Sequence, residues 1–229
     1  MRTVHFRSLS LVAAAVLTLT GGVAAQDRPS GLLSNLEVRQ LVARAEPGDQ
    51  AQLSAHFTAL GDRYAAQAKR HISMSQRFIG NPSRKLGTGM SAHCKRLADL
   101  NTQSATTVRE LAAYHAKLAS GTPATPPRDA ARFQGGAGAP EPTEQELNAL
   151  AAKASTPAEH RGLEEYFLTL AKRYTAEANE HVALAQRYRG TRIAQAAVHH
   201  DRLAGLSRDA AKEATVAAEM HKGLAGVAR

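Results

Sequence analysis

The chain contains one long segment twice, and this repetition constrains the fold more than any other feature. Residues Ala55–Gly80 align with Glu165–Gly190 at an offset of 110 positions without a gap. A second match, at an offset of 106, aligns His93 with His199 and His115 with His221. The identical residues of the first match include Phe57 and Phe167, Leu60 and Leu170, Arg63 and Arg173, Tyr64 and Tyr174, His71 and His181, Gln76-Arg77 and Gln186-Arg187, and Gly80 and Gly190. The sequence therefore predicts two copies of one structural unit.

The apolar residues of the repeat recur at helical spacing. Phe57, Tyr64, His71 and Phe78 are seven positions apart, and steps of seven return to nearly the same face of a helix. A composition rich in alanine, without tryptophan and with little valine or isoleucine, favours helix over strand. We expect an all-α protein with long helices at residues 47–79, 90–118, 157–189 and from about 191 to 226.

Three capping boxes divide the rest of the chain. They start at Ser34, Thr143 and Thr156, each with a glutamate three residues later, and the first two predict short helices. Residues 120–142 are rich in Pro, Gly and Ala without periodicity, which is typical of a linker. We therefore expect a first helical repeat at 34–119, a linker at 120–142 and a second helical repeat at 143–229.

Each pair of long helices predicts an αα-hairpin. The inner face of one hairpin is rich in alanine and buries too little apolar surface, so we expect two internally duplicated hairpins to form an antiparallel four-helix bundle. In this arrangement both turns lie at the same end, and the two short accessory helices close the other end. A homodimer of separate hairpins is the competing arrangement, so monomer and homodimer both stay open.

The first 25 residues are typical of a secretory signal peptide. Arg2 and Arg7 precede an apolar run, and Val23 and Ala25 stand at the −3 and −1 positions of the cleavage site. We expect residues 26–33 to form a flexible leader of the mature chain. The apolar run is shorter than the roughly 20 residues that span a bilayer, and no later stretch is long enough. The prediction is a periplasmic or extracellular protein that is not transmembrane after cleavage.

The charge balance narrows the choice of partners. The formal net charge is +9, and removal of Arg2 and Arg7 leaves +7. A basic exported protein suits an anionic cell-envelope surface, whereas the scarcity of aromatic residues argues against nucleic acid. Cys94 is the one cysteine, so an internal disulfide is excluded. Its thiol is either buried, free or an intermolecular link.

Six histidines fall at matched positions on the stripe that also carries leucines and aromatic residues. If both turns lie at one end, His71, His93, His181 and His199 meet in one layer. Four inward imidazoles are a plausible site for Zn, Cu or Ni, and two of them could ligate a non-covalent haem. A second candidate group lies further from the turns and consists of His115, His221, His56 and His160.

Two other interpretations of these histidines compete with the metal site. They are a purely structural polar core, as in an envelope interaction module, and a packing that responds to pH, because buried titratable groups need partners. Met74 and Met90 lie three residues from His71 and His93, which suggests a copper-type set. Their counterparts in the second copy are Leu184 and Ala196, so core filling explains them better.

The sequence gives little support to an enzyme. It lacks the Glu-x-x-His pairs of di-iron bundles, the HExxH and GxSxG motifs, a Gly-rich phosphate loop and the Cys-x-x-Cys-His haem attachment. We expect an exported helical-bundle protein that acts by binding rather than by catalysis.

Overall fold

The computed structural model describes residues 32–44, 46–81, 84–120 and 142–227, and the regular secondary structure in these ranges is entirely helical. The expected signal peptide, nearly all of the leader and residues 121–141 of the linker lie outside the described residues. The helices are α1 (Asn35–Arg44), α2 (Pro47–Ile79), α3 (Arg84–Ala119), α4 (Glu144–Lys153), α5 (Pro157–Arg189) and α6 (Gln195–Val227).

The ends of the helices follow local sequence signals. All three predicted capping boxes are confirmed: the hydroxyls of Ser34, Thr143 and Thr156 accept from a backbone N–H three residues later, at 3.2 to 3.3 Å. The bounds of α2 and α5 agree with the prediction. α3 begins at Arg84, before the expected residue 90, and α6 begins later than expected at Gln195.

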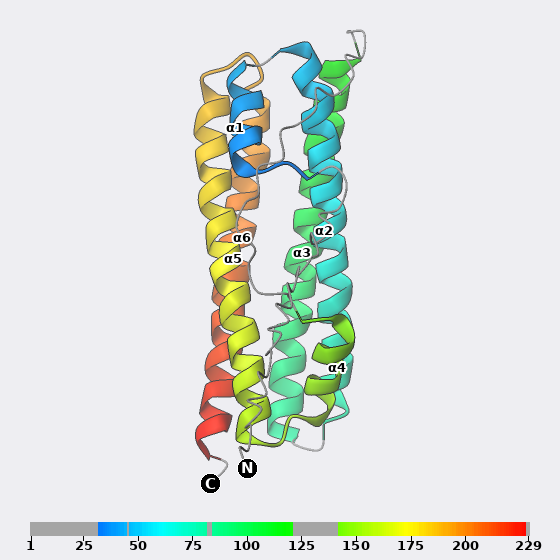
Figure 1. Ribbon diagram of the computed structural model, residues 1–229, viewed down its shortest axis with the longest axis vertical. Coiled ribbons are helices and arrows are strands. Elements are labelled where there is room, and N and C mark those ends of the chain that lie inside the picture. Colours follow the sequence, from blue (N-terminus) through cyan, green and yellow to red (C-terminus); the bar gives the residue numbers. More distant parts are fainter. Residues whose placement is uncertain (1–31, 45, 82–83, 121–141, 228–229) are drawn as a thin grey trace, which may run out of the picture.

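The four long helices form two antiparallel hairpins, α2–α3 and α5–α6, which lie side by side (Figure 1). Our expectation that both turns share one end is wrong. The α5–α6 turn lies at the end that we call the upper end, and the α2–α3 turn lies at the lower end (Figure 1). At the lower end Gly89 of α3 lies against Met220 of α6, and at the upper end Tyr188 of α5 contacts His115 of α3. α3 therefore runs antiparallel to α6.

The two short helices lie at different ends instead of closing one end together. α1 lies near the upper end and α4 near the lower end, and both contact α2 and α5 (Figure 1). Arg39 of α1 pairs with Glu180 of α5, and Asn148 of α4 donates to Ser73 Oγ of α2 at 2.8 Å. Each short helix thus binds a long helix of the other repeat. By contrast, α3 and α6 pack directly on each other.

The interior contains one apolar cluster toward each end. The lower cluster includes Met74, Phe78, Met90, Cys94 and Phe167, and the upper cluster includes Leu53, Phe57, Leu111, Leu184 and Tyr188.

A central polar layer, made of Tyr64, Tyr174, Asn101, Glu177 and Arg63, lies about midway along the long helices. Tyr64 donates to Glu177 Oε2 at 3.0 Å, and Asn101 Nδ2 donates to the Tyr174 hydroxyl at 2.6 Å. Arg63 pairs with the second carboxylate oxygen of Glu177 at 2.6 Å. These contacts cross between the two hairpins, so they fix how the hairpins are aligned.

Candidate functional site

The structure separates the four histidines that we expected to meet in one layer. His71 and His93 lie on the helices that flank the lower turn, whereas His181 and His199 lie on those that flank the upper turn (Figure 1). Because the turns lie at opposite ends, the two pairs are several helical turns apart. The expected four-imidazole metal or haem layer is therefore not formed by these residues.

His93 and His199 also lie away from the central core, between α3 and α6. The His93 ring contacts the carboxylate of Glu213, and His199 Nδ1 lies 3.7 Å from Glu110 Oε2. The two side chains are about one-fifth exposed. They connect α3 and α6 through carboxylates, which makes them contacts between the hairpins.

The residues that face inward are the ones that follow His199 and His93 in the chain. These are His200 and Cys94, and both are fully buried. Our sequence reasoning placed no candidate site at His200. A signal for it exists, because counting back in steps of seven from His221 reaches residues 214, 207 and 200. The same count from His115 reaches Cys94. Adjacent helical residues point about 100° apart, so this choice decides which side chain enters the core.

At the upper end, two imidazoles form a direct pair. His181 Nδ1 lies 3.1 Å from His200 Nδ1, a distance that fits one N–H donor and one lone-pair acceptor. The ring of Tyr188 stacks on His200 at 5.2 Å between centroids, and Phe57 contacts the same ring edge-on at 5.6 Å. Aromatic rings thus surround a neutral, hydrogen-bonded histidine pair.

The other upper histidines have separate partners. His115 Nδ1 lies 2.7 Å from Gln50 Oε1, so Nδ1 carries the proton. His115 Nε2 then accepts from the Tyr188 hydroxyl at 3.1 Å. His56 Nδ1 accepts from the backbone N–H of Leu33 at 3.0 Å. Gln50 and Tyr188 are partners that sequence reasoning did not identify.

At the lower end, a second imidazole pair takes the place that Gln50 and His115 have at the upper end. His160 Nδ1 lies 3.3 Å from His221 Nδ1, and Phe167 stacks on His221 with an interplanar angle of 11°. His160 is the counterpart of Gln50, and His221 is the counterpart of His115. The second candidate group therefore divides between the ends: His160 pairs with His221, whereas His56 and His115 lie at the upper end.

Burial keeps these imidazoles neutral at pH 7. It lowers the pKa of His56 and His115 to about 4 and that of His71, His181 and His221 to about 3. It also lowers the pKa of His160, and it holds the pKa of His200 well below its ordinary value, with the neighbouring His181 adding to the effect. An apolar interior disfavours the charged imidazolium, so the core can accept protons only by changing its packing.

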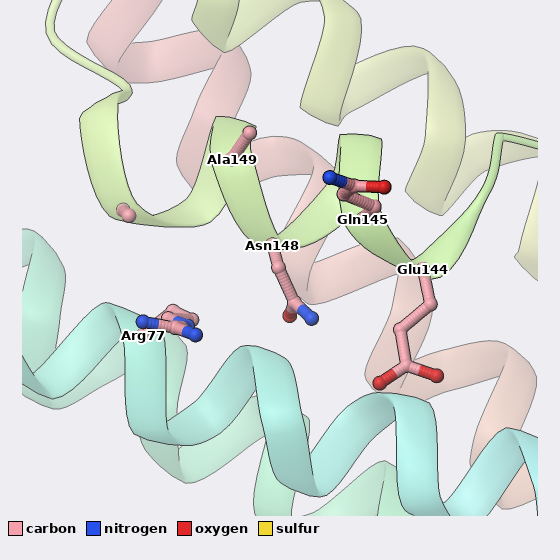
Figure 2. Close-up of a pocket in the computed structure, with 6 residues that line it drawn as sticks. Arg77, Glu144, Gln145, Asn148 and Ala149 are labelled. Atoms are coloured by element: carbon pink, nitrogen blue, oxygen red, sulfur yellow. The ribbon is translucent and has the colours of Figure 1, made fainter.

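No three His, Cys, Asp or Glu side chains within the described ranges gather around one point. Among the described residues, the surface carries open grooves. One, of about 440 Å³, lies between α2 and α4 and includes Arg77, Asn148 and Glu144 (Figure 2). Another, of about 580 Å³, lies along α5 and α6 beside Asn179 and Arg208. The histidines line neither groove, so the chemistry of the interior is separate from these surfaces.

Comparison with known proteins gives no further guide to the site. No protein-family model, curated protein or solved structure matches this chain. Within the described ranges, no helix is both long and apolar enough to cross a membrane.

Proposed function

We propose that this protein is an exported binding module of the cell envelope whose histidine-containing core makes its packing responsive to acid. Its architecture would be an antiparallel four-helix bundle of duplicated hairpins. The observation that carries the proposal is the presence of two buried imidazole pairs, His181–His200 and His160–His221, at opposite ends of the molecule.

The pairs support an acid response because each pair is stable only while it carries no more than one extra proton. A second proton would place two positive charges about 3 Å apart in an apolar environment, which is strongly unfavourable. Protonation therefore favours states in which the rings reach water. Both pairs join α5 to α6, so acidification would loosen the packing inside the second hairpin.

The charge of the chain supports an anionic envelope surface as the partner. After cleavage at the expected position the net charge is +7, since Arg2 and Arg7 are lost. Exposed basic residues such as Arg96 and Lys212 extend from the long helices. We infer that the basic outer face binds anionic envelope components.

Two variants taken from the repeat itself test the acid response. Position 160 holds histidine and the equivalent position 50 holds glutamine, so His160→Gln and Gln50→His each introduce a residue that the fold already carries there. The measurement is the free energy of unfolding by urea between pH 7.5 and pH 5. Each buried histidine contributes a slope of up to about 1.4 kcal/mol per pH unit.

We expect His160→Gln to reduce the loss of stability on acidification and Gln50→His to increase it. Equal pH dependence in the wild type and His160→Gln would contradict the proposal. That variant retains a hydrogen-bonding side chain opposite His221, so the comparison does not depend on Gln50→His folding well.

Binding to the envelope is tested separately with lipid vesicles. The mature protein should co-sediment with phosphatidylglycerol vesicles at low salt and be released at high salt, because exposed charges are screened. Phosphatidylcholine vesicles serve as the control. Absence of binding to the anionic vesicles at every salt concentration would exclude an anionic lipid surface as the partner.

A further inference from the structure

The lower end differs from the upper end in one chemical respect: it holds every sulfur atom of the described residues. These are Met74, Met90, Cys94 and Met220. At the upper end, the counterparts of the first three are Leu184, Ala196 and His200. The two ends of this duplicated molecule therefore offer different sets of donor atoms.

Helical spacing brings four of the lower donors together on one hairpin. His71 and Met74 are three residues apart on α2, and Met90 and Cys94 are four residues apart on α3, so each couple shares a helix face. All four side chains are fully buried, at 0% exposure. Met74, Met90 and Cys94 belong to one apolar cluster.

Hydrogen bonds between Ser75 and Ser91 fix the two couples at the same level. Ser75 Oγ donates to the Ser91 backbone carbonyl at 3.0 Å and lies 2.8 Å from Ser91 Oγ. Ser75 follows Met74 in the chain, and Ser91 follows Met90. The hairpin thus aligns the imidazole and thioether of α2 with the thioether and thiol of α3.

His71 is the member of this set whose polar atoms are not satisfied by the surrounding residues. Neither of its ring nitrogens has a hydrogen-bond partner among the described residues. Its counterpart His181 pairs with His200, but the residue that corresponds to His200 is Cys94. Leaving a buried polar group without a hydrogen-bond partner is unfavourable. A bound ligand would relieve this cost.

We propose that His71, Met74, Met90 and Cys94 form a binding site for a soft monovalent metal ion, copper(I) above all. Thiolate and thioether ligands select copper(I), and imidazole also binds it. Only His71 and Cys94 of this set belong to the residue types His, Cys, Asp and Glu, so the site agrees with the absence of a cluster of three such residues in the described ranges.

Charge decides between a monovalent and a divalent ion. As the copper–sulfur bond forms, the Cys94 S–H bond breaks and its proton passes to solvent, while the copper stays copper(I) and no electron is transferred. The thiolate and the monovalent ion then sum to zero charge, which an apolar core tolerates. A divalent ion would leave one uncompensated positive charge, since the neighbouring carboxylate of Glu213 is already paired with the guanidinium of Arg96.

The protonation states of the free protein agree with this exchange. Burial lowers the pKa of His71 to about 3, so its lone pair is available at neutral pH. Burial raises the pKa of the Cys94 thiol, so the thiol carries its proton until a metal displaces it. The proposed site does not depend on the acid response or on envelope binding.

The test is a competition for copper(I) between the mature protein and bicinchoninate under anaerobic conditions, with silver(I) as a redox-inert probe. We expect one copper(I) per chain, release of one proton per ion, thiolate-to-copper charge-transfer absorption and a higher melting temperature. The absence of copper(I) uptake by the refolded wild-type protein would overturn the proposal.

Variants locate the site. Cys94→Ser and Met74→Leu should each weaken copper(I) binding by roughly tenfold or more. Leucine occupies the position equivalent to Met74 in the other repeat, so Met74→Leu is expected to fold. Met220→Leu is the matched control, since Met220 lies at the same end outside the set, and its affinity should equal that of the wild type. Wild-type affinity in both Cys94→Ser and folded Met74→Leu would also overturn the proposal.

Discussion

At the scale of single residues, the chemistry of the core depends on which of two adjacent side chains faces inward. His200 and Cys94 enter the core, whereas His199 and His93 face carboxylates between α3 and α6. Adjacent helical positions differ by about 100°. At His199 and His200, one step along the chain therefore separates a buried imidazole pair from a partly exposed contact with a carboxylate.

We predict that the hydrogen bond of the Tyr188 hydroxyl stabilises the folded chain. Burial raises the pKa of this phenol, which stays a hydrogen-bond donor to His115 Nε2. Tyr188→Phe introduces the residue that the first repeat carries at the equivalent position 78. It leaves the buried His115 Nε2 without its hydrogen-bond donor. We expect the free energy of unfolding at pH 7.5 to fall by about 1–2 kcal/mol. Tyr114→Phe is the control, because the Tyr114 hydroxyl has no hydrogen bond to the described part of the chain, and an equal loss in both variants would refute the assignment.

At the scale of helices, the buried face of α6 is rich in small residues. The inner face of α6 carries Ala210, Ala214, Ala217 and Ala218, all nearly or fully buried. Small side chains allow helix axes to approach closely, so this face leaves no room for larger residues.

Enlargement of that face should be destabilising. We expect Ala214→Leu to reduce the free energy of unfolding by about 1–3 kcal/mol, because the added atoms must displace packed neighbours. Ala113→Leu adds the same atoms at an exposed position of α3 and should change stability little. Urea denaturation of both variants checks the prediction, and an unchanged Ala214→Leu would show that the interface is loosely packed.

At the scale of the whole molecule, buried histidines at both ends connect stability to pH. His56, His115, His181 and His221 have pKa values of about 3 to 4 in the folded chain, below the ordinary value near 6.5. As the pH falls, the histidines of the unfolded chain therefore bind protons at a higher pH than the same histidines of the folded chain. The stability that neutral burial contributes is complete above about pH 6.5 and is lost as the pH falls toward 4.

This linkage predicts cooperative unfolding in mild acid. Four such groups together reduce the free energy of unfolding by roughly 5–6 kcal/mol at pH 5.5, which is comparable with the whole stability of many domains. Circular dichroism of the mature protein should show loss of helix or a large fall in melting temperature between pH 6.5 and pH 4.5. A melting temperature that stays constant across this range would contradict the assignment of these histidines as neutral core residues.

The sequence by itself determined the elements. Apolar periodicity and capping boxes placed α2 and α5 at their observed bounds and the starts of α1 and α4 within a residue, and the repeat predicted two equivalent hairpins. These signals are local, since capping and the apolar stripe depend on residues within a few turns of one another. The histidines were correctly identified as unusual, and His160 and His221 were correctly named as candidate neighbours.

Only the tertiary structure decided which histidines meet. The chain between Ala119 and Glu144 is long enough, at about 3.3 Å per residue, to pass the whole length of a helix of about 50 Å. It therefore permits the second hairpin to begin at either end, and local signals do not choose between them. Contacts across the hairpins, such as Tyr64 with Glu177 and Tyr188 with His115, fix the observed orientation. That orientation keeps His71 and His93 apart from His181 and His199, and it brings Met220 of α6 to the end where Met74, Met90 and Cys94 of the first hairpin lie.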